Sequence, residues 1–367
     1  MTMTMASSTT PQILLTGATG YIGGTILDHF LNSKSPAFSG ATISVLLRGE
    51  DRAAKLTSTY GSRVKPILYK DIDDLDATVA AAAQHDVVIN TTLGFHPASV
   101  QAVIRGLAQR KAATGRDTWL IHTSGASNFC DHPITKKWVE PEGREFDDAK
   151  DDIYGYEKDR EVREGPYHQR TTEIGAIDLA LELGVKSIVI NSGTIYGRGT
   201  GLFNKTSTQV PLFVRAVLEL KKGIVLGDGK GVWDHVHVED LAELYLLVLE
   251  RIVAKGGEGI PYGKKGIIFS SNGRHQWLDV AQGVADAVFA EGLIPSNKLE
   301  SLTLEEAAKY LLDGQAGPEL VEKAVVSNSR TVPSVAKSLG WKPTRGEEAW
   351  KRGFVEEVKA ELEKRKQ

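Results

Sequence analysis

Residues 13–24 constrain the fold more than any other stretch, because a short apolar run passes through spaced glycines directly into a helix-like pattern. The apolar run at 13–15 is typical of a parallel strand buried on both faces. Glycines follow at 17, 20 and 23, and apolar residues then recur at helical spacing to residue 31. A side chain at Gly17 or Gly20 would occupy the space where phosphates lie, and the bare N–H groups of a helix N-terminus hold their charge. The stretch therefore predicts a dinucleotide site at a strand-to-helix turn.

The same strand-helix rhythm continues to about residue 191. The pattern predicts strands near 12–16, 42–47, 64–69, 86–91, 118–123 and 185–191, with helices between them that include 78–84, 100–113 and one from about 167 to 184. This is the signature of an α/β fold with a doubly wound parallel (Rossmann) sheet and a smaller C-terminal substrate region. We predict a disordered tail at 1–10, a dinucleotide-binding domain at 11–197 and a mainly substrate-binding region at 198–367, with 233–250 returning to the first domain.

The end of the second strand usually selects between the two nicotinamide dinucleotides. An acidic side chain there accepts a hydrogen bond from a ribose hydroxyl and favours NAD. Arg48 stands at this position instead, and its planar guanidinium suits a 2′-phosphate. The sequence thus predicts NADP (NADPH), with NAD disfavoured; the plainer interpretation of Arg48 is a solvated basic loop.

The glycine spacing also carries a family resemblance. Thr16-Gly17-x-x-Gly20-x-x-Gly23 resembles the cofactor turn of the extended short-chain dehydrogenase/reductase superfamily, of the NAD-dependent epimerase/dehydratase type. Segments 192–197, 233–240, 329–330 and 339–343 resemble later signatures of the same superfamily, in the expected order. Together the turn and the resemblance predict these cofactor contacts: Gly17, Thr19, Gly20, Tyr21, Ile22, Gly23, Arg48, Asp71, Ile72, Thr91, Thr92, Ser192 and Thr194.

The resemblance also implies a catalytic tyrosine, a lysine four residues later and a serine or threonine near the fifth strand. The literal tyrosine–lysine pattern occurs at Tyr154 and Lys158. Tyr167, however, lies 24 residues before Asn191, which is room for one helix and one strand, whereas Tyr154 lies 37 before it. We therefore predict Tyr167 as the proton donor, and the Tyr154 and Lys158 pair stays open as the alternative.

Two consequences follow from placing the tyrosine at 167. The lysine position is then occupied by Thr171, so the usual cation is missing. Ser124 and Ser127 are both candidates for the hydroxyl that orients the substrate, because both follow the fifth predicted strand. The plainer interpretation is a tyrosine that only packs beneath the cofactor.

Composition excludes several other classes of protein. Lys and Arg number 44 against 47 Asp and Glu, giving a net charge of −3, so a nucleic-acid partner is disfavoured. Cys130 is the only cysteine, which excludes an internal disulfide and is typical of a reducing compartment. No uncharged apolar run reaches membrane-spanning length. We expect a soluble cytoplasmic enzyme without a membrane partner, and the family resemblance implies a homodimer.

Other segments give weaker expectations. His235 and His237 alternate along a strand and share a face, but without a third ligand we expect structural histidines and no metal site. Residues 131–164 are rich in charge of both signs and predict a surface excursion near the site. Segments 130–165 and 198–232 are expected to close the pocket, and Trp350, Phe354 and Val358 predict a core-facing tail helix.

The sequence thus favours an NADPH-dependent oxidoreductase that reduces a small carbonyl or related unsaturated substrate. Two alternatives remain open. One is a nucleotide-sugar epimerase or dehydratase, although that chemistry needs a strong tyrosinate base. The other is a non-catalytic NADP-binding redox sensor, which the incomplete catalytic set allows.

Overall fold

A computed structural model describes residues 11–311 and 317–366, so the predicted tail at 1–10 lies outside the described residues. Its central feature is a seven-stranded, entirely parallel sheet in the order β11-β7-β5-β4-β1-β2-β3. The strands are β1 (Ile13–Thr16), β2 (Ile43–Leu47), β3 (Val64–Leu68), β4 (Val87–Asn90), β5 (Trp119–Gly125), β7 (Lys186–Ser192) and β11 (Ile267–Phe269). The predicted doubly wound sheet is confirmed. The three-residue strand β11 was not predicted, because so short an apolar run has no readable period.

Helices cover both faces of this sheet. The helices of the first half are α1 (Tyr21–Asn32), α2 (Glu50–Tyr60), α3 (Leu75–Ala82), α4 (Pro97–Thr114), α5 (Ile153–Arg163) and α6 (His168–Glu182). Because side chains alternate along β1, Ile13 and Leu15 join the core beneath α1, whereas Leu14 joins the core beneath α3, α4 and α6. A strand buried on both faces is what the unbroken apolar run requires.

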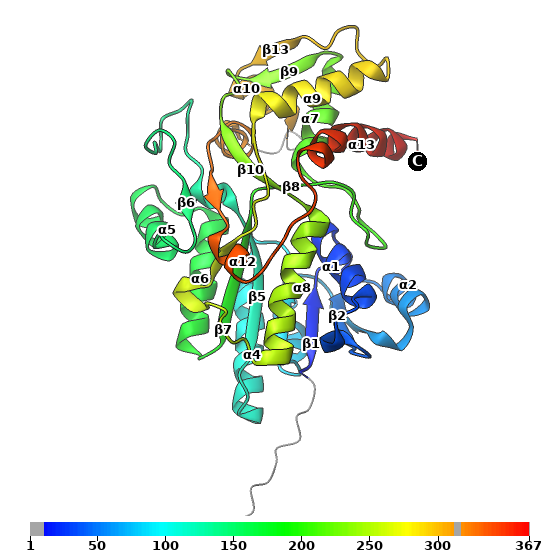
Figure 1. The fold of residues 1–367 in the computed structure, drawn as a ribbon, viewed down its shortest axis with the longest axis vertical. Helices are drawn as coiled ribbons and strands as arrows, with labels where there is room; N and C mark the ends of the chain where they lie inside the picture. Colours follow the sequence, from blue (N-terminus) through cyan, green and yellow to red (C-terminus); the bar gives the residue numbers. More distant parts are fainter. Residues whose placement is uncertain (1–10, 312–316, 367) are drawn as a thin grey trace, which may run out of the picture.

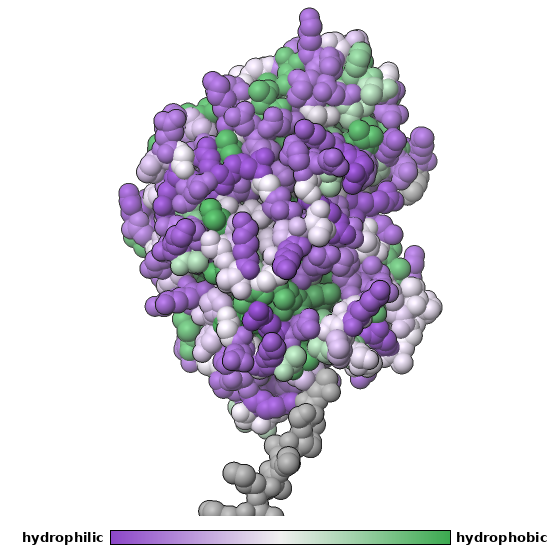
Figure 2. All heavy atoms as spheres, viewed as in Figure 1, coloured by the Kyte–Doolittle hydropathy of each residue, from purple (hydrophilic) through white to green (hydrophobic). Residues whose placement is uncertain are grey.

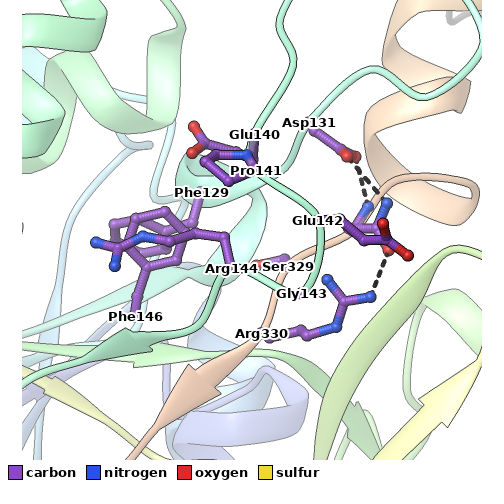
Figure 3. A pocket seen from close by; sticks show the side chains of 11 residues that line it. Phe129, Asp131, Glu140, Pro141, Glu142, Gly143, Arg144, Phe146, Ser329 and Arg330 are labelled. Atoms are coloured by element: carbon purple, nitrogen blue, oxygen red, sulfur yellow. Dashed lines mark hydrogen bonds between the residues drawn. The ribbon is translucent and has the colours of Figure 1, made fainter.

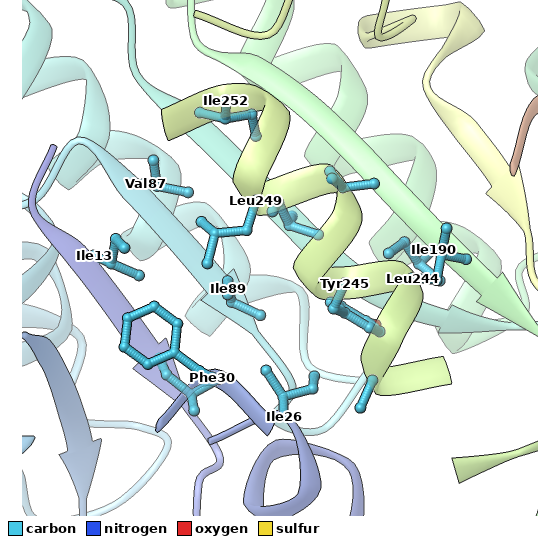
Figure 4. Packing of buried hydrophobic residues seen from close by; sticks show 14 of the residues in the cluster. Ile13, Ile26, Phe30, Val87, Ile89, Ile190, Leu244, Tyr245, Leu249 and Ile252 are labelled. Atoms are coloured by element: carbon cyan, nitrogen blue, oxygen red, sulfur yellow. The ribbon is translucent and has the colours of Figure 1, made fainter. Parts of the chain in front are cut away.

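Helix α8 (Val238–Lys255) returns from the second half of the chain to this sheet. Figure 4 shows Leu249 of α8 packed over the strands that carry Ile13 and Ile89, close to Phe30 of α1. Strand β10 (Val232–His237) leads into it and lies in a small sheet with β8 (Thr194–Tyr196) and β12 (Arg274–Gln276). The packing of α8 agrees in position with the predicted return at 233–250, while the domain boundaries themselves stay a prediction.

The remaining elements form a second, smaller region with its own apolar core, at the top of Figure 1. They are α7 (Gln209–Leu220), β9 (Gly223–Leu226), α9 (Trp277–Ala290), β13 (Leu299–Leu302), α10 (Leu304–Ala307), α11 (Pro318–Val325) and α13 (Glu347–Arg365), with β14 (Thr331–Val332) and α12 (Ser334–Ser338) running between the two regions. Trp350, Phe354 and Val358 of α13 are buried in this core. The predicted core-facing tail helix is therefore confirmed.

The segment 131–164 is more than the predicted surface excursion. It contains the short strand β6 (Phe146–Asp147), which pairs with β14, and the helix α5. Glu157 and Arg160 on α5 have no exposed surface, although residues 134–137 and 141–143 are exposed as expected. The prediction was wrong for α5 because its charges are satisfied by partners inside the protein, which composition does not reveal.

The face of the molecule seen in Figure 2 is mainly hydrophilic, with apolar residues in small separate patches. Among the described residues, no helix combines the length and the apolar character that crossing a membrane requires. Cys130 is buried in the apolar core of the second region and carries a free thiol.

Candidate active site

The glycine turn between β1 and α1 is shaped first by packing against β4. Gly17 has φ +76°, and a Cβ there would lie 2.6 Å from the carbonyl oxygen of Thr91. A Cβ at Gly23 would lie 2.4 Å from both the Gly17 oxygen and the Thr91 hydroxyl. Thr91 in turn donates a hydrogen bond of 2.7 Å to Thr16, which fixes the end of β4 against the turn. The space at Gly17 is thus taken by the protein itself, contrary to our expectation that phosphates fill it.

Gly20 has different surroundings. A Cβ there would meet only the Gly17 oxygen, at 3.1 Å, so the other side of this residue is open. Within the described part of the chain no side chain caps α1, and its first turn holds no acidic residue. Uncapped N–H groups at a helix N-terminus attract negative charge. The turn therefore fits the pyrophosphate of a dinucleotide, with Gly20, Tyr21 and Ile22 at the N-terminus that would hold it.

The segment after β8 packs against the start of α1, which sequence reasoning missed. The Tyr21 hydroxyl donates a hydrogen bond of 2.5 Å to the Gly197 oxygen, and the Asn204 N–H donates one of 3.4 Å to the Thr19 oxygen. A Cβ on Gly24 would lie 3.3 Å from the Gly201 Cα. The signal was present as the glycines at 197, 199 and 201, which allow this close approach.

Arg48 lies exposed directly after β2, where the sequence placed it. Burial raises the pKa of the Tyr69 phenol after β3, and the positive charge of Arg48 opposes that rise, so the two groups are neighbours. Ile72, Tyr69 and Thr92 line a small cavity between the ends of β1, β3 and β4. Asp71 is half-buried and accepts a hydrogen bond of 2.9 Å from the Asp73 N–H.

Asn90, at the end of β4, organises the centre of the sheet's carboxyl edge and was not predicted. Its Oδ1 accepts hydrogen bonds of 2.6 Å from the hydroxyls of both Thr16 and Thr92. Its Nδ2 lies 3.2 Å from Nδ1 of the buried His122 on β5. A polar residue that closes an otherwise apolar buried strand is the signal that could have found it.

Tyr167 and Ser127 are brought together by the fold. The Tyr167 hydroxyl donates a hydrogen bond of 3.0 Å to the Ser127 hydroxyl oxygen. Tyr167 is the N-cap residue of α6, and Ser127 lies in the short helix Ala126–Phe129 that follows β5. Burial raises the pKa of Tyr167 to about 12, and the hydrogen bond with Ser127 opposes the rise. Phe95, 42% exposed, meets the Tyr167 ring edge-on at 6.3 Å between ring centroids.

Ser124, the other candidate hydroxyl, has a different neighbour. It is buried at the end of β5, where it opposes the rise that burial causes in the pKa of Glu173 on α6. The structure therefore pairs Ser127, and not Ser124, with Tyr167.

The alternative pair, Tyr154 and Lys158, lies on α5 and shares one partner. The Tyr154 hydroxyl donates to Asp178 on α6, and the Lys158 ammonium lies 3.0 Å from the other oxygen of Asp178. Thr171, in the position of the usual lysine, donates its hydroxyl to Glu161. The literal motif thus forms a contact between two helices, and the catalytic assignment of Tyr167 stays a prediction.

A buried charge cluster lies beside Tyr167. Glu164 accepts hydrogen bonds of 2.6 Å from Arg160 and 3.0 Å from Arg170, whose side chains have no exposed surface. The Lys323 ammonium of α11 lies 3.1 Å from the second oxygen of Glu164. Burial alone would raise the pKa of Glu164, but Arg160 and Lys323 outweigh it and lower that pKa to about 2.

Two further carboxyls, Glu157 of α5 and Glu173 of α6, are fully buried and bind one amide group. Asn128 Nδ2 donates to Glu157 at 2.9 Å and to Glu173 at 2.7 Å. Burial raises the pKa of both groups, and the neighbouring Glu173 raises that of Glu157 further. Like charges without water cannot both ionise cheaply, so the pair holds at least one proton near neutral pH.

Figure 3 shows a polar cavity of about 220 Å³ between residues 140–144 and 328–330. The Arg144 guanidinium stacks over Phe146, 4.6 Å from the ring centroid. Arg330 donates a hydrogen bond of 3.1 Å to Asn328, which is itself held by Asp131. Acidic and basic groups alternate around this cavity, and no single sign of charge dominates it.

The remaining predicted site residues lie in the protein interior. Ser192 is buried and accepts a hydrogen bond of 2.8 Å from Ser270, and Thr194 is buried in β8. His235 and His237 share a face as expected, because both rings contact Tyr196 edge-on. Residues 11–311 and 317–366 contain no group of three or more His, Cys, Asp or Glu side chains placed to hold a metal.

Comparison with known proteins identifies the family. The model of the NAD-dependent epimerase/dehydratase family matches residues 157–260. An Acremonium protein named oxidase ucsJ is 30% identical over 312 residues, covering 82% of this chain and 85% of its own. An uncharacterized protein of Saccharomyces cerevisiae is 24% identical over 363 residues, covering 95% of this chain and 98% of its own.

Solved structures share the fold at low sequence identity. The dTDP-glucose 4,6-dehydratase DesIV of Streptomyces venezuelae, solved with NAD, has a TM-score of 0.64 and 15% identity over 96% of this chain and 98% of its own. The yeast methylglyoxal/isovaleraldehyde reductase Gre2, solved with NADPH, has a TM-score of 0.60 and 14% identity over 97% and 99%. Both of these proteins were solved with a nicotinamide dinucleotide bound. The chain belongs to the NAD-dependent epimerase/dehydratase family of the extended short-chain dehydrogenase/reductase superfamily and is an enzyme of the NAD(P)-dependent oxidoreductase type.

Proposed function

We propose that the protein is an NADPH-dependent reductase of a small carbonyl or related unsaturated substrate. The observation that carries the proposal is the hydrogen bond of 3.0 Å between the hydroxyls of Tyr167 and Ser127. Reduction of a carbonyl needs a proton donor and an orienting group within reach of the same oxygen. These two hydroxyls are adjacent to each other and can meet that requirement.

A protonated Tyr167 can play the acid role that a reduction requires. A bound dinucleotide supplies the hydride in this chemistry. Ser127 would orient the substrate oxygen, and the Tyr167 hydroxyl would deliver its proton to it. Since burial raises the pKa of Tyr167 to about 12, the phenol carries its proton at neutral pH. It is thus ready to act as an acid, whereas the oxidation of an alcohol starts from a base.

Arg48 supports the preference for NADPH. The guanidinium is exposed at the tip of β2, and within the described residues it has no carboxylate partner. Its neighbour Tyr69 and the nearby Ile72 offer an aromatic and an apolar surface on the side where the adenine is expected. A cation beside that surface favours a ribose that carries a 2′-phosphate.

The second candidate function is a nucleotide-sugar epimerase or dehydratase, which the family match and the fold of DesIV favour. Those reactions begin by oxidising a sugar hydroxyl and regenerate their cofactor within each turnover. The distinction is therefore one of stoichiometry. A reductase consumes one NADPH for each product, whereas an epimerase or dehydratase turns over many substrates with less than one equivalent of cofactor.

Two measurements on the purified protein test the proposal. The first is calorimetric or fluorescence titration with NADPH and NADH, in which we expect NADPH to bind more tightly. The second is a panel of aldehydes, ketones, enones and nucleotide sugars assayed with excess and with substoichiometric cofactor. We expect stoichiometric NADPH consumption with a carbonyl. Turnover of a nucleotide sugar with substoichiometric cofactor would replace the proposal, and cofactor binding without any turnover would favour a redox sensor.

A further inference from the structure

The phenol of Tyr167 faces a cation that comes from a distant part of the chain. Lys323 lies on α11 of the second region, and its ammonium is 4.3 Å from the centroid of the Tyr167 ring. The Lys323 side chain is only 7% exposed. An ammonium at this distance over an aromatic face interacts with the ring directly, and the interaction strengthens when water is excluded.

Lys323 shares its nearest carboxylate with two other cations. Glu164 pairs with Lys323, but the same carboxylate also binds Arg160 and Arg170. Glu161 is the second anion of the cluster, with its Oε2 2.7 Å from Arg170. Three cations therefore share the two carboxylates of this cluster, while Glu319, four residues before Lys323 on α11, has a pKa lowered by its hydrogen bond with Lys137 and by the charges of Lys137 and Lys323.

Several other titratable groups in the described part of the chain lie around Tyr167, among them Glu161, which accepts a hydrogen bond of 3.3 Å from the Tyr167 N–H. Arg170 of α6 and Arg160 of α5 lower its pKa, and the buried Cys130 thiol raises it. His132 has a lowered pKa because it is buried, so it stays neutral beside Glu164. Lys323 is the cation that lies over the ring itself.

We propose that Lys323 supplies the positive charge that the lysine missing at position 171 would provide. Its ammonium stabilises the phenolate that forms when Tyr167 gives up its proton. The O–H bond of Tyr167 breaks and its electron pair stays on the oxygen. The proton forms the new O–H bond of the product, NADPH is oxidised to NADP as the carbonyl is reduced, and water later returns a proton to Tyr167. This catalytic consequence rests on the proposed reductase function, whereas the electrostatic coupling of Lys323 to Tyr167 does not.

The positive charge that faces the Tyr167 ring comes from the second region of the molecule. Because α11 carries Lys323, the polar environment of Tyr167 is complete only when this helix is seated on Glu164. A further bond secures that seat: Glu322, the residue before Lys323, accepts hydrogen bonds from the N–H groups of Ile134 at 2.6 Å and Thr135 at 3.0 Å. The segment after Cys130 and helix α11 are thus held together directly at the site.

The test uses the full chain with fluorotyrosine placed at position 167, so that the more acidic phenol titrates in an accessible range and is followed by ¹⁹F NMR. Lys323→Met and Lys323→Gln should raise the pKa of this phenol measurably, because each removes an opposite charge beside the phenolate. Lys323→Arg should leave it nearly unchanged. The matched control is Lys158→Met, which removes the lysine of the literal motif and should not shift the titration.

The titration needs no substrate, so it is independent of whether the enzyme is a reductase. Thermal unfolding of each variant shows that a shift comes from charge and not from a loosened fold. The proposal is overturned if Lys323→Met and Lys323→Gln both leave the titration unchanged. It is also overturned if Lys158→Met shifts the titration and the two Lys323 variants do not. On an accepted carbonyl, Lys323→Met should slow single-turnover reduction at least ten-fold with unchanged NADPH affinity; an equal loss of rate and affinity means that Lys323 only supports the fold.

Discussion

Replacing two glycines of the first turn with alanine should affect two different properties. Gly23→Ala should lower the stability of the protein, and Gly20→Ala should lower its affinity for the cofactor. At Gly23 the new Cβ would lie 2.4 Å from the Gly17 oxygen and from the Thr91 hydroxyl, far inside the ordinary contact range of 3.4–4 Å. Both obstacles are fixed by hydrogen bonds, so α1 must shift away from β4. Overpacking of this kind costs about 1–3 kcal/mol of the free energy of unfolding. At Gly20 the Cβ meets one oxygen at 3.1 Å and otherwise open space, so stability should change little.

Cofactor affinity should separate the same two variants. The open side of Gly20 is where we place the pyrophosphate, so a methyl group there should weaken NADPH at least ten-fold, or about 1.4 kcal/mol. Chemical denaturation gives the stability of each variant, and fluorescence titration gives its NADPH affinity. A Gly20→Ala protein that binds NADPH as tightly as the parent would refute the placement of the cofactor on this face. A Gly23→Ala protein of unchanged stability would refute the packing argument.

Three other outcomes are expected. Arg48→Ala should weaken NADPH roughly ten- to hundred-fold and leave NADH nearly unchanged, because a charge-assisted contact contributes about 1.5–3 kcal/mol and NADH lacks the phosphate; equal weakening of both in calorimetry would assign Arg48 to the fold. Glu173→Gln should flatten the pH dependence of stability. Burial raises the pKa of Glu173, so its contribution to the free energy of unfolding is fully present below the ordinary pKa of 4.5. That contribution is lost as the pH rises through the raised pKa, at up to about 1.4 kcal/mol per pH unit. Denaturant unfolding at several pH values measures this, and parallel curves for parent and variant would contradict it. Tyr154→Phe should keep most of the single-turnover rate, because that hydroxyl serves Asp178; loss of the rate would place the catalytic pair on α5.

The fold followed from the sequence because its main elements have strong local signals. Most of the strands carry mainly apolar runs, and the amphipathic tail helix has a clear period of four. Strand β11 and the pairing of β6 with β14 escaped prediction because they are only two or three residues long. Such strands are specified by partners distant in the sequence, and pattern alone does not contain that information.

Part of the candidate site could be predicted from the sequence for the same reason. Counting residues back from Asn191 located Tyr167 at the start of α6, and the structure then paired it with Ser127. Lys323 could not have been found this way, since it reaches Tyr167 from a helix more than 150 residues away in the sequence. Charges of both signs on α5 indicated a solvated surface, yet Arg160 is buried because Glu164 and backbone oxygens satisfy it.

The central claim is that Tyr167 is the proton donor of an NADPH-dependent reduction. The most direct test is the single-turnover oxidation of bound NADPH by an accepted carbonyl, followed through the absorbance of the nicotinamide in the parent and in Tyr167→Phe. We expect one NADPH to be oxidised for each carbonyl reduced. In Tyr167→Phe we expect the rate of NADPH oxidation to be about 10²–10⁴-fold lower, with unchanged NADPH affinity. A Tyr167→Phe protein that oxidises NADPH at the parental rate would contradict it.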